Sequence, residues 1–290
     1  MRRLCVLLAM AGTGVMGLRG AEGPGAGPKS EPPSPAAAQA GPSAPAVLTP
    51  ATPAATPKAK LPEGNAAGSE GVAIAMLEQK GASFELDAQG HAQSAVLAGP
   101  KLDDAVLAQL VYLPNLESLD IGKSAVKEAG IAHLGRLIGL KRLYLHDLPI
   151  GDHALVHLRN MIDLDVLSLQ NTRVEGRGLL YIRELVHLRV LNLSQTKVTD
   201  ESLVYLKGLS DLDTLALEDT GVTGAGLVQL KPLDKLRVLN LNGCKVTNVD
   251  LLGLVGHDAL RMLYVHRCKV TEQGVLGFKR QMISLAVYYD

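Results

Sequence analysis

The sequence predicts an α/β solenoid, because apolar residues recur at a fixed step of 24 residues along most of the chain. The strongest observation is a row of leucines without exception: Leu119, Leu143, Leu167, Leu191, Leu215, Leu239 and Leu263. A period of about 20–50 residues is typical of solenoids, in which each unit buries its apolar side against its neighbours. The period therefore indicates how the protein presents a surface, and leaves open what that surface binds.

Three further apolar rows keep the same step. One row is Leu116, Leu140, Leu164, Leu188, Leu212, Leu236 and Leu260. The next is Ile121, Leu145, Leu169, Leu193, Leu217, Leu241 and Val265. The last is Val126, Ile150, Val174, Val198, Val222, Val246 and Val270.

Each unit is predicted to be a strand, a turn and a short helix. In Val190–Ser194, Leu191 and Leu193 alternate with residues that point the other way, which is typical of a half-buried strand. Thr199 or Asp200 then offers an N-cap oxygen. Leucines follow at helical spacing: Leu203, Leu206 and Leu209. Strands stack at about 4.8 Å and helices at about 8–10 Å, so the stack must curve with its strands on the concave side.

The repeats resemble those of leucine-rich-repeat proteins, with the pattern Leu-x-x-Leu-x-Leu-x-x-Thr/Cys-x-Val-Thr-x-x-Gly-Leu-x-x-Leu over residues 92–283. Their form is similar to the cysteine-containing subtype and to exported bacterial proteins with 24-residue units. The resemblance implies an arc with a concave parallel β-sheet and convex short helices. It also implies that the Thr/Cys position faces inward and satisfies backbone groups of the turn. Here that position holds Ser124, Thr172, Thr196, Thr220, Cys244 and Cys268.

The amino-terminal third has a different composition. Residues 1–20 have a basic start, a short apolar run and small residues, which predicts a cleaved signal peptide, with an uncleaved anchor as the alternative. Residues 21–66 contain 11 of the 15 prolines, which predicts a disordered Pro/Ala-rich linker. We therefore expect an exported protein, located in the periplasm, in the cell envelope or outside the cell.

The folded part is expected to begin with an amino-terminal cap over residues 67–91, followed by leucine-rich repeats over residues 92–290. Val72–Lys80 reads as a short helix ended by Gly81, and two short strands flank a turn at Gly90. Leu148, followed by Pro149, departs from the repeat pattern, so we expect its turn to differ. At the carboxy terminus, 284–289 is expected to form a last strand without a covering helix.

Composition and motifs exclude several classes of function. The formal net charge is zero, with 29 basic and 29 acidic residues, so the basic surface that nucleic acids require is missing and we expect no nucleic-acid partner. No nucleophile elbow, phosphate loop or paired-carboxylate motif occurs, so we expect no enzyme and no cofactor. His133, His153 and His157 could approach one another, but the same column continues without ligands, so we expect no metal site.

Two smaller features are interpreted structurally. Cys244 and Cys268 lie on neighbouring strands, where either a disulfide or two buried thiols can form, and we favour the thiols. A ladder of alternating charges should support the register of the repeats and contribute little to stability. Its members are Glu117, Lys141, Asp165, Arg189, Asp213, Arg237 and Arg261.

The outward strand positions are the candidate ligand-binding site. They carry amides, hydroxyls and aromatic rings rather than the Lys/Glu mixture of an ordinary solvated face, and tyrosine in particular is favoured in interfaces. Tyr144, His146, Tyr264 and His266 are the expected anchors near the two ends of the arc. The full set is Asp120, Arg142, Tyr144, His146, Ser168, Gln170, Asn192, Ser194, Glu218, Asn240, Asn242, Tyr264 and His266.

The function predicted from the sequence is an exported, non-catalytic recognition scaffold that binds a protein, a peptide or an envelope ligand on its concave sheet. No stable membrane span is expected. The alternative is a structural envelope component that self-associates weakly through the edge of its carboxy-terminal strand, because exposed strand edges pair readily.

Overall fold

The computed structural model of the chain describes residues 69–290, so the expected signal peptide and linker lie outside the described residues. Ten strands form one sheet in sequence order, with β1 antiparallel to β2 and every later pair parallel. The strands are β1 (Ser83–Leu86), β2 (Ala92–Val96), β3 (Ser118–Asp120), β4 (Arg142–Tyr144), β5 (Val166–Ser168), β6 (Val190–Asn192), β7 (Thr214–Ala216), β8 (Val238–Asn240), β9 (Met262–Tyr264) and β10 (Ala286–Tyr288).

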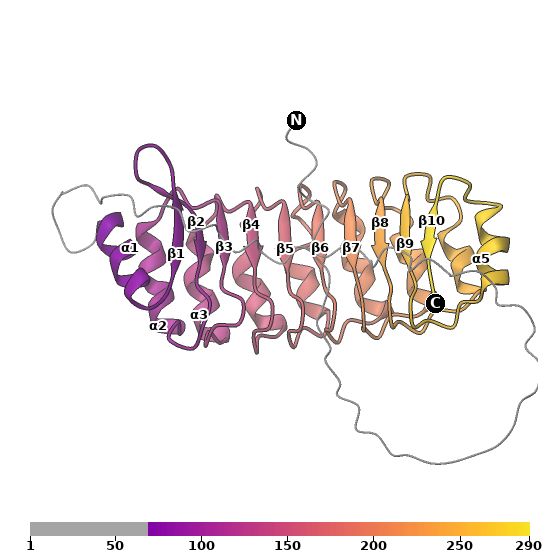
Figure 1. Cartoon of the computed structure of the whole chain (residues 1–290), viewed down its shortest axis with the longest axis horizontal. Helices are drawn as coiled ribbons and strands as arrows, with labels where there is room; N and C mark the ends of the chain where they lie inside the picture. The colour runs from indigo at the N-terminus through magenta and orange to yellow at the C-terminus, as the bar shows by residue number, and fades with distance from the viewer. Residues whose placement is uncertain (1–68) are drawn as a thin grey trace, which may run out of the picture. The chain divides into compact units, whose positions relative to one another are not determined.

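A short helical segment follows nearly every strand and lies behind the sheet in Figure 1. Many of these segments are 3₁₀ rather than α-helices, because so few residues fit between successive strands of a 24-residue unit. The segments are α1 (Glu70–Gln79), α2 (Asp104–Leu107), η1 (Ala108–Tyr112), α3 (Glu128–Ile131), η2 (Ala132–Arg136), η3 (Asp152–Leu158), η4 (Arg177–Tyr181), η5 (Asp200–Gly208), α4 (Gly224–Leu227), η6 (Val228–Leu230), η7 (Asp250–Leu254) and α5 (Glu272–Lys279).

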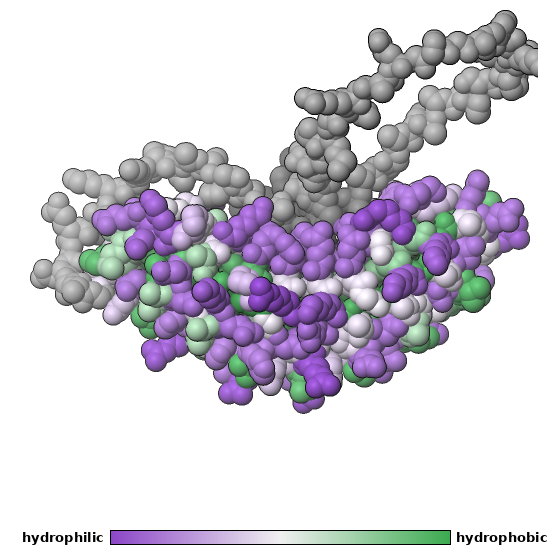
Figure 2. Space-filling model, turned by 90° about the horizontal axis from the view of Figure 1, so that it is seen from below, coloured by the Kyte–Doolittle hydropathy of each residue, from purple (hydrophilic) through white to green (hydrophobic). Residues whose placement is uncertain are grey.

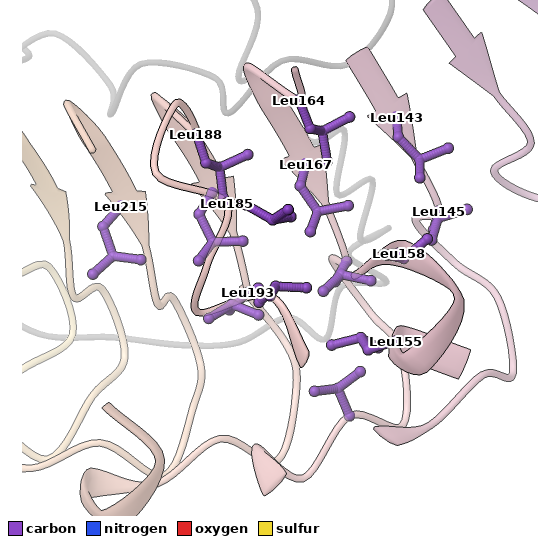
Figure 3. Close-up of a cluster of buried hydrophobic side chains, with 14 of the residues drawn as sticks. Leu143, Leu145, Leu155, Leu158, Leu164, Leu167, Leu185, Leu188, Leu193 and Leu215 are labelled. Atoms are coloured by element: carbon purple, nitrogen blue, oxygen red, sulfur yellow. The ribbon is translucent and has the colours of Figure 1, made fainter. Parts of the chain in front are cut away.

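The sequence period is the register of the sheet. Leu143 pairs with Leu119 on one side and Leu167 on the other, each 24 residues away, and every parallel pair keeps this step. All seven leucines of this row are 0% exposed. Figure 3 shows strand leucines such as Leu167 and helical leucines such as Leu158 turned toward the same interior. The predicted solenoid is therefore confirmed, with a continuous core between sheet and helices.

The sheet forms the inner side of the arc and the helical segments form its outer side (Figures 1 and 2). At the amino-terminal end, α1 buries Ala73, Ile74 and Leu77 against the core. The β1–β2 hairpin then adds an antiparallel strand to the sheet. Within residues 69–290, no helix is both long enough and apolar enough to cross a membrane.

A side-chain oxygen accepts the backbone N–H at the start of each helical segment, and this oxygen has two alternative sources. The preceding repeat usually supplies it, as when Asp200 Oδ1 accepts from Thr223 N at 2.7 Å. Where the donor position of the preceding repeat is Gly224, Asp250 of the same repeat accepts from Thr247 N at 2.8 Å. A Cβ on Gly224 would overlap Asp250, so the glycine makes room for the second arrangement. Both satisfy an otherwise unpaired donor at a helix start.

The turns after the strands are uniform. Each has one residue with positive φ, and this includes Asp147 (φ 58°) before Leu148. Our expectation that the Leu148 turn would differ is therefore wrong for its backbone. What changes is one hydrogen bond: Arg173 N donates to Ile150 O in the next repeat, and Pro149 has no N–H for the equivalent bond.

Candidate functional site: the concave face of the sheet

Side chains from three positions of each repeat point toward the concave side, and parallel pairing places equivalent residues side by side. We name these the leading, central and trailing rows, in chain order. The leading row is Arg142, Val166, Val190, Thr214, Val238 and Met262. The central row is Asp120, Tyr144, Ser168, Asn192, Ala216, Asn240 and Tyr264. The trailing row is Gly122, His146, Gln170, Ser194, Glu218, Asn242 and His266.

The central row is buried, whereas we expected it to face solvent. Asn192 is 1% exposed and Tyr264 is 3% exposed, and the other members reach at most 6%. Strands only about 4.8 Å apart bring each side chain against its neighbours in adjacent repeats, which cover it. The trailing row is more open, because Gln170, Glu218 and His266 are half-buried. Arg142 in the leading row is exposed.

Polar side chains of the central row bind the backbone of their own strand end. Asn192 Oδ1 accepts from Ser194 N at 2.9 Å, and Asn240 Oδ1 accepts from Asn242 N at 3.0 Å. Asn192 Nδ2 also donates to Gln170 Oε1 of the preceding repeat at 3.1 Å. These amides are therefore fixed in orientation by bonds within and between repeats. The hydroxyl of Ser194 is buried beside them without a hydrogen-bond partner in residues 69–290.

His146 lies between two carboxylates. Its Nδ1 is 2.8 Å from Asp147 Oδ2, which is a hydrogen bond, and its Nε2 is 3.5 Å from Asp120 Oδ1. The second contact has an ion-pair distance but not the geometry of a hydrogen bond, so Nε2 has no hydrogen-bond partner in the part of the chain described. Asn171 Nδ2 donates to Asp147 Oδ1 at 2.7 Å and extends the cluster into the next repeat.

These contacts change the acid–base properties of the cluster. The Asp120 carboxylate raises the pKa of His146 above its ordinary value; burial opposes this, and Asp147 adds to it. Burial acts to raise the pKa of Asp147, but the hydrogen bonds from Asn171 and His146 outweigh it and lower that pKa. Burial also raises the pKa of the neighbouring Tyr144.

Tyr264 and His266 occupy the equivalent positions near the other end of the arc, but their surroundings differ. The Tyr264 ring stacks on Tyr288 of β10, with centroids 4.6 Å apart and planes 8° from parallel. Burial raises the pKa of Tyr264 to about 12. His266 Nδ1 lies 3.0 Å from Asp290 Oδ1, and the side chain of His266 is 32% exposed against 12% for His146.

An arginine crosses one whole repeat beside this second site. Arg267 Nη2 contacts Glu218 Oε1 at 2.9 Å and Asp219 Oδ2 at 3.1 Å, although both acids lie two repeats earlier in the chain. The intervening position is Gly243, where a Cβ would overlap the Asp219 carboxylate. The glycine therefore lets one cation neutralise two acids on the trailing side of the face.

Sequence reasoning missed the leading row, apart from Arg142. Val166, Val190, Val238 and Met262 give the concave face an apolar strip next to the polar central row, and Val166 is only 5% exposed. The signal was present, because these residues also recur every 24 positions, one before the invariant leucine. Figure 2 views the edge at which the strands end, and hydrophilic residues dominate that edge. The apolar strip is thus confined to the leading side of the face.

The inward Thr/Cys position behaves as the resemblance implied. Thr196 Oγ1 donates to Leu193 O at 2.6 Å, within its own repeat. Cys244 Sγ instead donates to Leu217 O at 3.1 Å, in the preceding repeat. Both Cys244 and Cys268 are free thiols. Burial raises the pKa of Cys244, and it raises that of Cys268 to about 11, so neither thiol is activated as a nucleophile.

The charge ladder resolves into separate pairs. Lys141 Nζ is 2.7 Å from Glu117 Oε1, and Arg189 Nε is 3.7 Å from Asp165 Oδ1. Arg237 pairs with Asp213 in the same way. These ion pairs are solvent-exposed on at least one side, and such pairs contribute about 0–1 kcal/mol each. In the described range 69–290, no group of three or more His, Cys, Asp or Glu side chains is placed to hold a metal ion.

Comparisons with known proteins identify the same fold. A family model described as Leucine Rich repeat matches residues 184–207. Internalin C2 of Listeria monocytogenes is similar, with a TM-score of 0.56 and 18% identity over 69% of this chain and 81% of that chain. An internalin (inlF) of the same organism has a TM-score of 0.52 and 20% identity over 68% of this chain and 59% of that chain. A search of curated proteins found no matching sequence. These likenesses show a leucine-rich-repeat fold.

Proposed function

We propose that this leucine-rich-repeat protein is a non-catalytic recognition scaffold that is exported and binds a protein, peptide or envelope ligand on its concave face. The observation that carries the proposal is a pair of buried polar atoms on that face, Ser194 Oγ and His146 Nε2, that lack hydrogen-bond partners among residues 69–290. Buried polar atoms are almost always paired. Two unpaired atoms on one face are therefore a reason to place a ligand there.

The chemistry of the three rows supports the same surface. The leading row supplies apolar area, the central row supplies fixed amides and hydroxyls, and the trailing row supplies half-buried polar side chains. Interfaces combine apolar contact with oriented hydrogen-bonding groups in this way. Because most of these side chains are already held by bonds between repeats, little side-chain entropy is lost when a partner binds.

Export is proposed from the sequence of residues 1–20, and the Pro/Ala-rich residues 21–66 are proposed as a spacer between the amino terminus and the repeats. Self-association through the edge of β10, the other function expected from the sequence, stays a prediction.

Site-specific cross-linking tests the binding face. A photoreactive amino acid is placed at Val190 or Val238 on the concave face, and at Val204 or Val228 on the convex face as matched controls. The controls are also valines in neighbouring repeats, and they are 41% and 48% exposed. We expect the concave positions to cross-link the same partner in extracts of the producing cells. Cross-links from the convex positions alone would contradict the proposal.

The partner found in this way then allows a quantitative comparison. A Val190→Arg/Val238→Arg double variant should lower its affinity at least about tenfold, which corresponds to about 1.4 kcal/mol. A Val204→Arg/Val228→Arg variant should bind like wild type. These valines are better probes than Tyr144 and Tyr264, because removing a packed tyrosine also disturbs the fold.

A further inference from the structure

His146 connects parts of three successive repeats. Its partner Asp120 belongs to β3, His146 and Asp147 follow β4, and Asn171 follows β5 and holds Asp147. The imidazole lies over the backbone of Gly122, where a Cβ would overlap the ring. The glycine in the trailing row is therefore what allows the histidine to reach both carboxylates.

The charge of this cluster depends on one proton. The charged groups that face His146 are Asp120 from the β3 side and Asp147 from its own repeat, and Lys123 acts on Asp147 from the turn after β3. From the β5 side, Gln170 and Asn171 carry no charge. With a protonated imidazole the two acids are balanced by two cations. With a neutral imidazole the cluster carries one uncompensated negative charge on the concave face.

The equivalent histidine near the other end of the arc lacks this arrangement. His266 has one carboxylate partner, Asp290, whose side chain is 64% exposed. The residue that corresponds to Gly122 is Asn242, whose Oδ1 accepts from His266 N at 2.8 Å. The side chain at position 242 occupies the place that the imidazole of His146 uses in its own repeat. His266 is therefore a natural internal control for His146.

We propose that His146 is a proton-operated staple of the concave face: when protonated it bridges Asp120 and Asp147 and ties neighbouring repeats together, and when neutral it leaves this part of the face negatively charged. The device is a property of the free protein and does not depend on the proposed partner. Because the pKa of His146 is raised on folding, the stabilisation is complete below about pH 6.5 and is lost as pH rises through the raised value.

Thermal unfolding of the full chain as a function of pH tests the proposal. Between about pH 6 and about pH 9, wild type should lose more thermal stability than His146→Gln, because only wild type can lose the proton that stabilises the folded state. Asp120→Asn should flatten the profile in the same direction. The control, His266→Gln, should keep the wild-type profile over this range.

Two results would overturn the staple: a His146→Gln profile that parallels wild type, or a His266→Gln variant that removes the same pH dependence. If His146→Gln does not fold, the titration of His146 is followed in wild type by the NMR shifts of its ring nitrogens. A midpoint at or below that of an unfolded histidine then contradicts the proposal, and a midpoint above it supports the proposal.

Discussion

Tyr144 with His146 and Tyr264 with His266 occupy the same positions of the repeat, five repeats apart, yet the structure makes them chemically different. His146 is enclosed by two carboxylates over Gly122, whereas His266 is more open and has one exposed partner. Tyr264 has a stacked ring beside it, and Tyr144 does not. In a solenoid, the position of a residue fixes which way it points, but the neighbouring repeats decide its environment.

A third histidine extends the comparison. His257 stands in a core row that is otherwise apolar in the preceding repeats: Leu113, Leu137, Met161, Leu185, Leu209 and Leu233. It is 4% exposed and its Nε2 has no hydrogen-bond partner among the described residues. Burial lowers its pKa, although Asp234 and Asp258 oppose this. The arc thus contains two histidines whose protonation acts on stability in opposite directions.

The largest expected effect is that of Gly122→Ala, which would make the first histidine site resemble the second. The added methyl group overlaps the His146 ring, and overpacking of this kind costs about 1–3 kcal/mol. Chemical denaturation should show this loss together with a weaker pH dependence above about pH 6.5. The counterpart Asn242→Ala removes only one hydrogen bond, worth about 1 kcal/mol. Equal losses in the two variants would break the comparison.

His257→Leu restores the apolar row and separates the second pH response from the first. Removing a buried, unpaired nitrogen should stabilise the protein by about 1–3 kcal/mol at neutral pH. Because the pKa of His257 is lowered on folding, wild type should also lose stability as pH falls below about 6.5, and the variant should lose less. Denaturation at several pH values measures both effects, with the exposed His153→Leu as a control. An unchanged acid limb would show that His257 is not responsible.

Tyr288→Ala tests whether stacking distinguishes Tyr264 from Tyr144. The variant removes the ring that stacks on Tyr264, and aromatic pairs contribute about 0.5–1.5 kcal/mol beyond their buried area. The pKa of Tyr264 should fall from about 12 toward its ordinary value, because the ring becomes more exposed. Ultraviolet titration of the tyrosines would detect the change. A titration indistinguishable from wild type would mean that Tyr288 does not shield Tyr264.

The smallest expected effect is that of Asp290→Asn. The Asp290 carboxylate is exposed, and interactions of exposed ion pairs with histidine are weakened by solvent. Its unfolding midpoint should match wild type within error at any pH above about 5. A clear loss of stability at low pH would instead place His266 in the same class as His146.

The sequence alone was sufficient for the leucine rows, the strands and the direction in which each row points, because a strict period of 24 residues leaves one register for the sheet. It did not predict that Asn192 and Tyr264 are buried, since this depends on the size and orientation of side chains one repeat away. The contact of Arg267 with Asp219 was equally out of reach, because it spans two repeats and depends on Gly243 between them.

The central claim, that neighbouring repeats decide the chemistry of equivalent residues, is tested most directly by titrating the histidines one by one. NMR of the ring nitrogens in ¹⁵N-labelled protein, assigned with His146→Gln and His257→Leu, gives each pKa separately. We predict that His146 titrates above about 6.5 and His257 below it, as carboxylate contact and burial respectively require. Coinciding midpoints, or the reverse order, would contradict the account.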